Sequence, residues 1–168
     1  MMNKLKKIAV ITFVTLVFAS CKDNDGFLDT LQKEVHYNCK LASENDQGFS
    51  TFKLSKITKF KWDRFYVFDE YVTEKNINSI SGITWDGPDV PSGHKRLFFI
   101  YKGGEVNYFD FDPKIFPLFL FTCESTEQYE FILKDDVFAT FESCDKNGCI
   151  LAMVPKRCIG NFKRLYKK

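Results

Sequence analysis

Short blocks of alternating hydrophobic and polar residues run through most of the chain and predict β-strands. The clearest block is Glu34–Leu41, where Val35, Tyr37, Cys39 and Leu41 alternate with polar residues. Strict alternation of this kind is typical of a half-buried strand. The apolar positions 27, 28, 31 and 35 suggest instead a short helix just before it, so the pattern leaves the start of this strand open.

Seven further runs of aromatic and β-branched residues predict strands. They are Trp62–Phe68, Arg96–Tyr101, Glu105–Phe111, Leu118–Thr122, Gln128–Lys134, Val137–Ser143 and Cys149–Val154. Gly103 and Gly104 separate two of these runs and predict a tight hairpin, because a type I′ turn needs positive φ at both central residues. The segment Asp145–Gly148 is expected to join the last two strands as a hairpin loop.

A short helix is predicted from Thr73 to Gly82. Thr73 is a good N-cap, Glu74 suits the first turn, and Gly82 can adopt the left-handed conformation that ends a helix. The segment Trp85–Gly93 contains Gly-Pro and Pro-Ser-Gly and is predicted to be an exposed, mobile loop. The last residues, 163–168, are expected to be solvated.

These elements predict a β-rich α+β fold. The strands follow one another through hairpins, which favours antiparallel pairing. We therefore expect an antiparallel sheet or a small barrel of six to eight strands with one or two short helices. The order of elements does not decide between the sheet and the barrel.

The beginning of the chain differs from the rest and predicts a signal peptide. Met1–Lys7 carries three lysines and no acid, and Ile8–Ala19 is an uncharged run of twelve residues. A helix needs roughly 20 apolar residues to cross a bilayer, so this run is too short to be a membrane span. A basic segment followed by a short apolar one is typical of a secretory signal peptide, which we assign to residues 1–20.

The residues that end this segment, Val17-Phe18-Ala19-Ser20-Cys21, resemble a bacterial lipobox. The resemblance implies cleavage before Cys21, a diacylglyceryl group on its thiol and an acyl chain such as palmitate on its new amino terminus. Two or more chains hold a protein stably on a bilayer. The alternative is ordinary signal cleavage, which leaves Cys21 a plain thiol.

The next residues, Lys22-Asp23-Asn24-Asp25, resemble the acidic export signals of surface lipoproteins in some Gram-negative bacteria. The expected location is therefore the cell envelope, with the protein lipid-anchored to the outer membrane on its periplasmic or exposed side. The expected organisation is a signal peptide at 1–20, a lipidated Cys and tether at 21–33, and one globular domain at 34–168.

Removal of the signal peptide changes the charge of the chain. Residues 1–20 contain three lysines and no acid, so the formal charge of +2 becomes −1 for the remaining 148 residues. A nearly neutral domain gives no reason to expect a nucleic-acid partner.

Five cysteines remain if Cys21 is lipidated, and an exported protein meets oxidising conditions that favour pairing. Cys144 and Cys149 flank the loop Asp145–Gly148, which can place them opposite each other as a disulfide. A two-residue turn at Asn147 and Gly148 would instead pair Cys144 with Leu151. The other three are odd in number, so at least one is free or pairs with another chain; they are Cys39, Cys123 and Cys158.

The chain contains no recognisable catalytic, phosphate-binding or metal-binding motif, so no cofactor or metal is expected. The acids Asp69, Glu70 and Asp110, together with His94, are the material for an alternative function, a small envelope hydrolase. We expect them to be solvated residues at the ends of strands.

One further resemblance concerns the segment Phe60–Phe68 with Tyr71 and Thr73. It is similar to a Phe-x-Trp-Asp strand motif of uncharacterised small bacterial lipoproteins, and this likeness implies an architecture but no activity. The expected function is that of a membrane-anchored envelope lipoprotein, a non-catalytic binding or inhibitor/immunity-type module. Its expected partners are the bilayer and a protein or glycan, with the Trp85–Gly93 loop as one contact surface.

Overall fold

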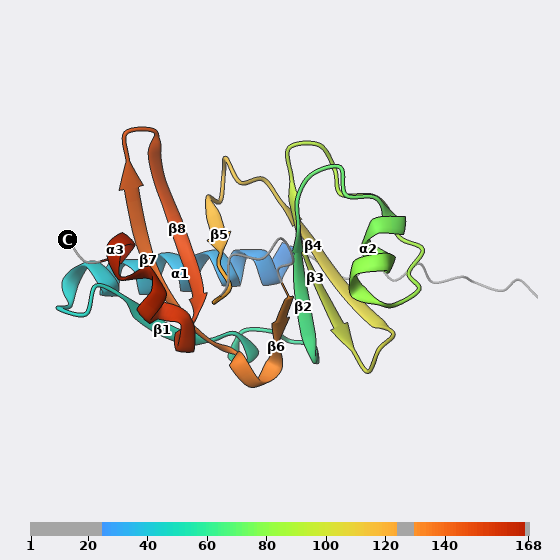
Figure 1. Cartoon of the computed structure of the whole chain (residues 1–168), viewed down its shortest axis with the longest axis horizontal. Coiled ribbons are helices and arrows are strands. Elements are labelled where there is room, and N and C mark those ends of the chain that lie inside the picture. The colour runs from blue at the N-terminus through green and yellow to red at the C-terminus, as the bar shows by residue number, and fades with distance from the viewer. Residues whose placement is uncertain (1–24, 124–129, 167–168) are drawn as a thin grey trace, which may run out of the picture.

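The computed structural model describes residues 25–123 and 130–166 and has an α+β fold. Eight strands form two four-stranded sheets, and three α-helices pack on them (Figure 1). The strands are β1 Ser50–Lys53, β2 Arg64–Phe68, β3 Lys95–Tyr101, β4 Glu105–Phe111, β5 Leu118–Leu120, β6 Glu130–Ile132, β7 Val137–Asp145 and β8 Gly148–Pro155. The helices are α1 Asp25–Glu44, α2 Glu74–Ser81 and α3 Lys163–Tyr166, with 3-10 turns η1 Leu54–Lys56, η2 Leu133–Asp135 and η3 Lys156–Phe162.

The two sheets confirm the predicted α+β class and show the sheet alternative, not the barrel. Sheet A has the strand order β1-β7-β8-β5, and sheet B has the order β4-β3-β2-β6. Every pairing is antiparallel except β5 with β8, which is parallel. The seven strands predicted from Trp62 onward lie within a few residues of observed ones, although residues 128 and 129 of the Gln128–Lys134 prediction lie outside the described residues.

Helix α1 overturns two expectations about the beginning of the domain. It starts at Asp25, within the expected tether, and continues through the segment predicted as a strand, so the strand over Glu34–Leu41 is wrong. The apolar residues that it buries recur every three or four positions, and they are Phe27, Leu31, Val35, Cys39 and Ala42. Tyr37, which completed the apparent alternation, is 60% exposed. The helical period therefore decides this segment, and the alternation of residues 35–41 is incidental.

The main hydrophobic core joins α1 and one face of each sheet. Aromatic rings dominate it because several strands contribute phenylalanine to it, among them Phe65 of β2, Phe99 of β3 and Phe109 of β4. The Phe65 ring stacks on Phe99 at 4.8 Å and on Phe131 at 4.6 Å between centroids, and Trp62 meets it edge-on at 5.6 Å. Stacked and edge-on pairs of this kind contribute beyond their buried area.

The opposite face of sheet B is covered by α2 and by the segment that follows it. The predicted caps of α2 are confirmed. The Thr73 hydroxyl accepts the N–H of Asn76 at 3.3 Å, and Gly82 has a φ of 72°. Two turns of helix are marginal alone, so the burial of Ile77 against the sheet stabilises α2.

The outer face of sheet A is covered by the end of the chain, in η3 and α3. The Tyr166 ring packs on Phe141 and on Phe49, each at 5.4 Å, and is 8% exposed. The prediction of a solvated end is therefore wrong for Tyr166, whereas Lys163, Arg164 and Leu165 are exposed as expected and residues 167 and 168 lie outside the described residues. A disulfide between Cys123 and Cys158 ties η3 to the segment after β5.

The β3–β4 hairpin is confirmed, but its turn is shifted by one residue from the prediction. Lys102, with a φ of 50°, and Gly103, with a φ of 71°, occupy the left-handed conformation. A side chain at a left-handed position is strained. The Lys102 N–H donates to Asp63 Oδ2 at 2.6 Å, which holds the turn in place.

Lys102→Gly is expected to raise the free energy of unfolding by roughly 0.5–1 kcal/mol, because glycine adopts the left-handed conformation without a steric cost. The measurement is urea unfolding followed by circular dichroism. Lys75→Gly, inside helix α2, is the matched control and should lower the free energy of unfolding by about 1 kcal/mol. A loss of stability in Lys102→Gly would contradict the assignment of the turn.

Candidate functional site

The four side chains of the hydrolase alternative are all engaged in structural contacts. Asp69 Oδ1 pairs with Lys95 Nζ at 2.5 Å, and Glu70 Oε2 accepts the N–H of Gly93 at 2.6 Å. His94 Nδ1 lies 2.9 Å from the carbonyl oxygen of Ser92. These contacts hold the ends of β2 and β3 to the neighbouring loop, so the carboxylates act as structural partners.

Asp110, the remaining acid of that set, belongs to a buried ion pair with Arg96. Arg96 Nε and Nη2 donate to the two Asp110 oxygens at 2.6 and 2.7 Å, and the Arg96 side chain is fully buried. The Arg96 guanidinium also lies 4.4 Å from the centroid of the Tyr108 ring. A bidentate pair of this kind fixes both side chains, which leaves Asp110 committed to Arg96.

Arg96 also holds the Trp85–Gly93 loop, the contact surface expected from the sequence. Its Nη1 and Nη2 donate to the carbonyl oxygens of Pro88 at 2.5 Å and Asp89 at 3.2 Å. Val90 is only 2% exposed, and the Trp85 ring packs on Phe98 at 5.0 Å. The loop is therefore exposed only in part, and its centre is attached to sheet B. Its mobility stays a prediction.

An open concavity of about 910 Å³ lies at the other end of the molecule, where α1 ends. It is formed by the end of α1 and the turn after it, by the β7–β8 hairpin, and by α3, which lie together on the left of Figure 1. Its polar lining includes Asp46, Gln47, Glu142, Ser143, Asp145 and Arg164. These residues come from three distant segments, so no local motif in the sequence could have revealed the concavity.

One side of the concavity is a turn held by Asn45. Asn45 Oδ1 accepts the N–H groups of Gln47 at 2.9 Å and Gly48 at 3.0 Å, while its Nδ2 donates to Leu41 O at 2.9 Å. Gly48 has a φ of 74°, and a Cβ there would lie 2.4 Å from the carbonyl oxygen of Tyr166. Only glycine therefore allows this turn to approach α3 so closely.

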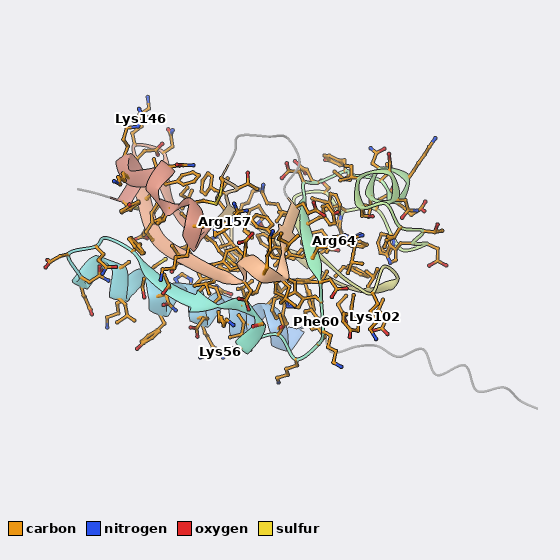
Figure 2. The ribbon with its side chains drawn as sticks, turned by 60° about the horizontal axis from the view of Figure 1, so that its bottom comes forward. Lys56, Phe60, Arg64, Lys102, Lys146 and Arg157 are labelled. Atoms are coloured by element: carbon orange, nitrogen blue, oxygen red, sulfur yellow. A yellow bond between two sulfur atoms is a disulfide. The ribbon has the colours of Figure 1, made fainter. Side chains whose placement is uncertain are left out.

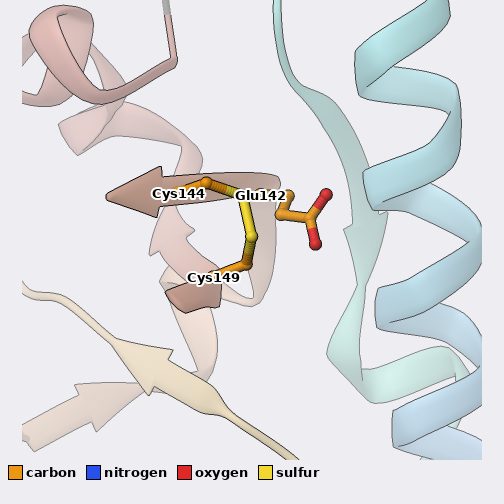
Figure 3. A group of neighbouring side chains, drawn as sticks. All are labelled: Glu142, Cys144 and Cys149. Atoms are coloured by element: carbon orange, nitrogen blue, oxygen red, sulfur yellow. A yellow bond between two sulfur atoms is a disulfide. The ribbon is translucent and has the colours of Figure 1, made fainter. Parts of the chain in front are cut away.

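The other side is the β7–β8 hairpin, closed by the disulfide between Cys144 and Cys149 (Figure 3). The two residues face each other in the register, as predicted, with a Cα–Cα distance of 4.0 Å. Asp145 pairs with Gly148, which places Lys146 and Asn147 at the centre of the turn. The turn is thus one residue earlier than the Asn147–Gly148 alternative, and this register brings the two cysteines together.

Glu142 lies beside this disulfide, and its carboxylate and the two sulfur atoms are within 4.8 Å of one another (Figure 3). Carboxylate and thiolate are both metal ligands, but the thiolate form is required. Sulfur atoms bonded to each other carry no such charge. In this state the group is a covalent brace for the hairpin with an exposed acid next to it.

Cys39 is the free thiol among the three cysteines that the sequence left unassigned. It lies on α1, is one of the residues that line the concavity, and is 6% exposed. Burial raises the pKa of the Cys39 thiol to about 12, and the charge of Glu142 acts in the same direction. A thiol that stays protonated is a poor nucleophile, so Cys39 is a packing residue.

Removal of the hairpin disulfide in Cys144→Ser/Cys149→Ser is expected to lower the free energy of unfolding by roughly 2 kcal/mol, the loop-closure entropy of so small a ring. Urea unfolding under non-reducing conditions measures it. The wild type unfolded in the presence of reductant is not a control, because Cys123 and Cys158 are then reduced as well. A double variant as stable as the wild type would show that the disulfide does not brace the hairpin.

Cys21 lies outside the described residues, so its predicted lipidation is not addressed by the structure. Among the residues that the structure describes, no helix is both long and apolar enough to cross a membrane. No protein-family model, curated protein or solved structure gives a significant match to this chain.

Proposed function

We propose that the protein is a lipid-anchored envelope lipoprotein that acts as a non-catalytic binding module, of the inhibitor or immunity type. The observation that carries the binding role is the contrast between two regions. The acids and His94 that could serve a hydrolase are occupied by structural contacts, whereas the concavity at the end of α1 is open and has a polar lining. The first region supports the fold, and the second is available to a ligand.

The construction of the concavity supports a binding role. Its walls are a turn fixed by four hydrogen bonds of Asn45 and a hairpin closed by a disulfide. Walls that are held before binding lose little conformational entropy when a partner binds. Loops and hairpins on a rigid scaffold are the usual place for recognition.

Charge around the concavity favours a partner with positive groups. Three acids line it, Asp46, Glu142 and Asp145, all exposed, against the single basic residue Arg164. Complementary charge steers encounter and gives specificity. We therefore favour a protein partner with a basic segment over a glycan, which would be bound by hydrogen bonds and would not respond to these charges.

A capture experiment tests the binding role. The protein is immobilised and exposed to envelope extract, and a bound protein is identified and then titrated against the wild type and against Asp46→Asn/Glu142→Gln/Asp145→Asn. Asp29→Asn/Asp86→Asn/Glu105→Gln, exposed acids away from the concavity, is the matched control. We expect the first variant to lose roughly tenfold in affinity at low salt, about 0.5 kcal/mol for each exposed charge, and the control to bind normally.

Two results would contradict the binding role. One is a partner that binds the concavity variant as tightly as it binds the wild type and the control, which would place the contact elsewhere. The other is hydrolysis of envelope substrates by the purified protein that is abolished by substitution of His94, which would favour the hydrolase.

A further inference from the structure

A group of exposed lysines lies at the end of the molecule opposite the concavity, next to the start of α1. Residues 53–64 contain Lys53, Lys56, Lys59, Lys61 and Arg64 against the single acid Asp63. Two of these bases have acidic partners: Lys53 with Asp136 at 3.7 Å and Arg64 with Glu130 at 3.7 Å. Lys59 and Lys61 are exposed and form no ion pair within the described part of the chain.

Lys102 joins this group through the Tyr101 ring. Lys61 Nζ lies 5.9 Å and Lys102 Nζ 5.3 Å from the centroid of that ring. Lys59 and Lys61 flank Phe60, whose ring packs against Phe27 at 5.5 Å, in the first turn of α1. Figure 2 shows Phe60 and Lys102 at the same end of the molecule, beside the start of that helix. We call Lys59, Lys61 and Lys102 the anchor-side lysines.

Chain geometry limits how far these lysines can lie from a lipid on Cys21. Asp25, the first residue of α1, is four positions after Cys21 in the sequence. Four residues of extended chain span at most about 14 Å. If Cys21 carries the lipid, the start of α1 and the side chains packed on it must lie close to the bilayer surface.

We propose that the anchor-side lysines bind the anionic phospholipid headgroups of the membrane to which the protein is attached, and thereby orient the domain. This inference rests on the proposed lipid anchor at Cys21. Each lysine close to an anionic membrane surface raises the affinity for that surface about fivefold. The Tyr101 ring lies near both Lys61 and Lys102. Tyrosine is enriched at membrane–water interfaces, which supports this orientation. The nearby exposed acids, Asp29, Asp63 and Glu105, reduce this attraction, and the Asp63 carboxylate is already turned toward the Lys102 N–H.

The orientation has a consequence for the concavity. A helix of 20 residues is about 30 Å long. The anchor-side lysines lie beside its start, next to Phe60 and Phe27, and the concavity lies at its end. A domain held by these lysines therefore presents the concavity away from the bilayer, where a soluble partner can reach it.

Lysine acylation of the lipidated protein tests the orientation. The protein is purified from membranes and its mass is measured first, because an absent acyl chain would refute the anchor independently of the lysines. It is then reconstituted in phosphatidylcholine vesicles with or without phosphatidylglycerol, and the rate of acylation at each lysine is followed by mass spectrometry. Lys114, Lys146 and Lys163 are exposed elsewhere and serve as internal references.

We expect Lys59, Lys61 and Lys102 to react about fivefold more slowly with phosphatidylglycerol present, with the references unchanged. The protection should disappear at 1 M salt, where the screening length is ~3 Å. On these vesicles, membrane contact should also slow the amide exchange of residues 100–103. The variant Lys59→Gln/Lys61→Gln/Lys102→Gln should lose this protection. The control Lys114→Gln/Lys146→Gln/Lys163→Gln should retain it. Equal reactivity of all six lysines would overturn the proposal, as would protection that is the same without phosphatidylglycerol.

If the mass shows no acyl chain, sedimentation of the unlipidated protein with the same vesicles tests the lysines alone. Binding that requires phosphatidylglycerol and is lost in the anchor-side triple variant would support the lysine contact without the anchor. No binding of that protein would overturn both the anchor and the contact.

Discussion

Arg96→Met is expected to lower the free energy of unfolding by about 3–5 kcal/mol, the cost of breaking a buried ion pair by removal of one partner. The Arg96 side chain is fully buried and makes four hydrogen bonds, two to Asp110 and one each to the carbonyls of Pro88 and Asp89. Methionine fills much of the space but donates nothing, so these acceptors lose their donors. Urea unfolding measures the loss, and amide exchange in the Trp85–Gly93 loop should rise with it.

Two further variants test whether the loss in Arg96→Met comes from the burial of its charge pair. Arg157→Met removes an ion pair of which the arginine side chain is 62% exposed, and it should cost at most about 1 kcal/mol. Asp110→Leu combined with Arg96→Met should be more stable than the sum of the single changes predicts, because the lone charge is then absent. An Arg96→Met loss no larger than that of Arg157→Met would contradict the role given to Arg96.

Phe65→Ala is expected to cost about 3–5 kcal/mol, the usual effect of removing a buried ring. Phe65 is 1% exposed and contacts rings from β3, β6 and β7 as well as Trp62. Its removal therefore opens a cavity where both sheets meet, which the neighbouring rings cannot fill. Thermal and urea unfolding of the variant both report this loss.

Phe119→Ala is the matched control for Phe65→Ala. Phe119 lies on the short edge strand β5 and is 37% exposed. Its loss should cost roughly 1 kcal/mol, since less area leaves water on folding. Similar losses for the two variants would indicate that the core is not centred on the β2–β3 rings.

Local signals in the sequence were enough for the elements that local contacts determine. Helix α2 has its own caps in Thr73 and Gly82, and the β3–β4 and β7–β8 hairpins have their turn residues between two strand patterns. The pairing of Cys144 with Cys149 followed from the hairpin in the same way. In the β3–β4 hairpin the turn was off by one residue, because Lys102 adopts a left-handed conformation that its type disfavours.

Features whose structure depends on distant contacts were predicted less well. The apolar residues 35–41 fit two periods, and only the packing of Val35 and Cys39 against sheet A selects the helix. The sequence predicts a solvated Asp110, because nothing local shows that Arg96, fourteen residues earlier, is buried beside it. The concavity forms only where three distant segments meet, so no local pattern predicts it. Cys123 and Cys158 are 35 residues apart and come together only because the chain returns across sheet A.

The central claim is that a lipid on Cys21 attaches this binding module to the envelope, and labelling with radioactive palmitate tests it most directly. The wild type and Cys21→Ala are expressed in a Gram-negative host, and label is followed together with membrane fractionation. We predict that the wild type carries label and sediments with membranes, and that Cys21→Ala carries none. Label retained by Cys21→Ala, or a wild type whose mature amino terminus is an unmodified Cys21, would contradict the claim.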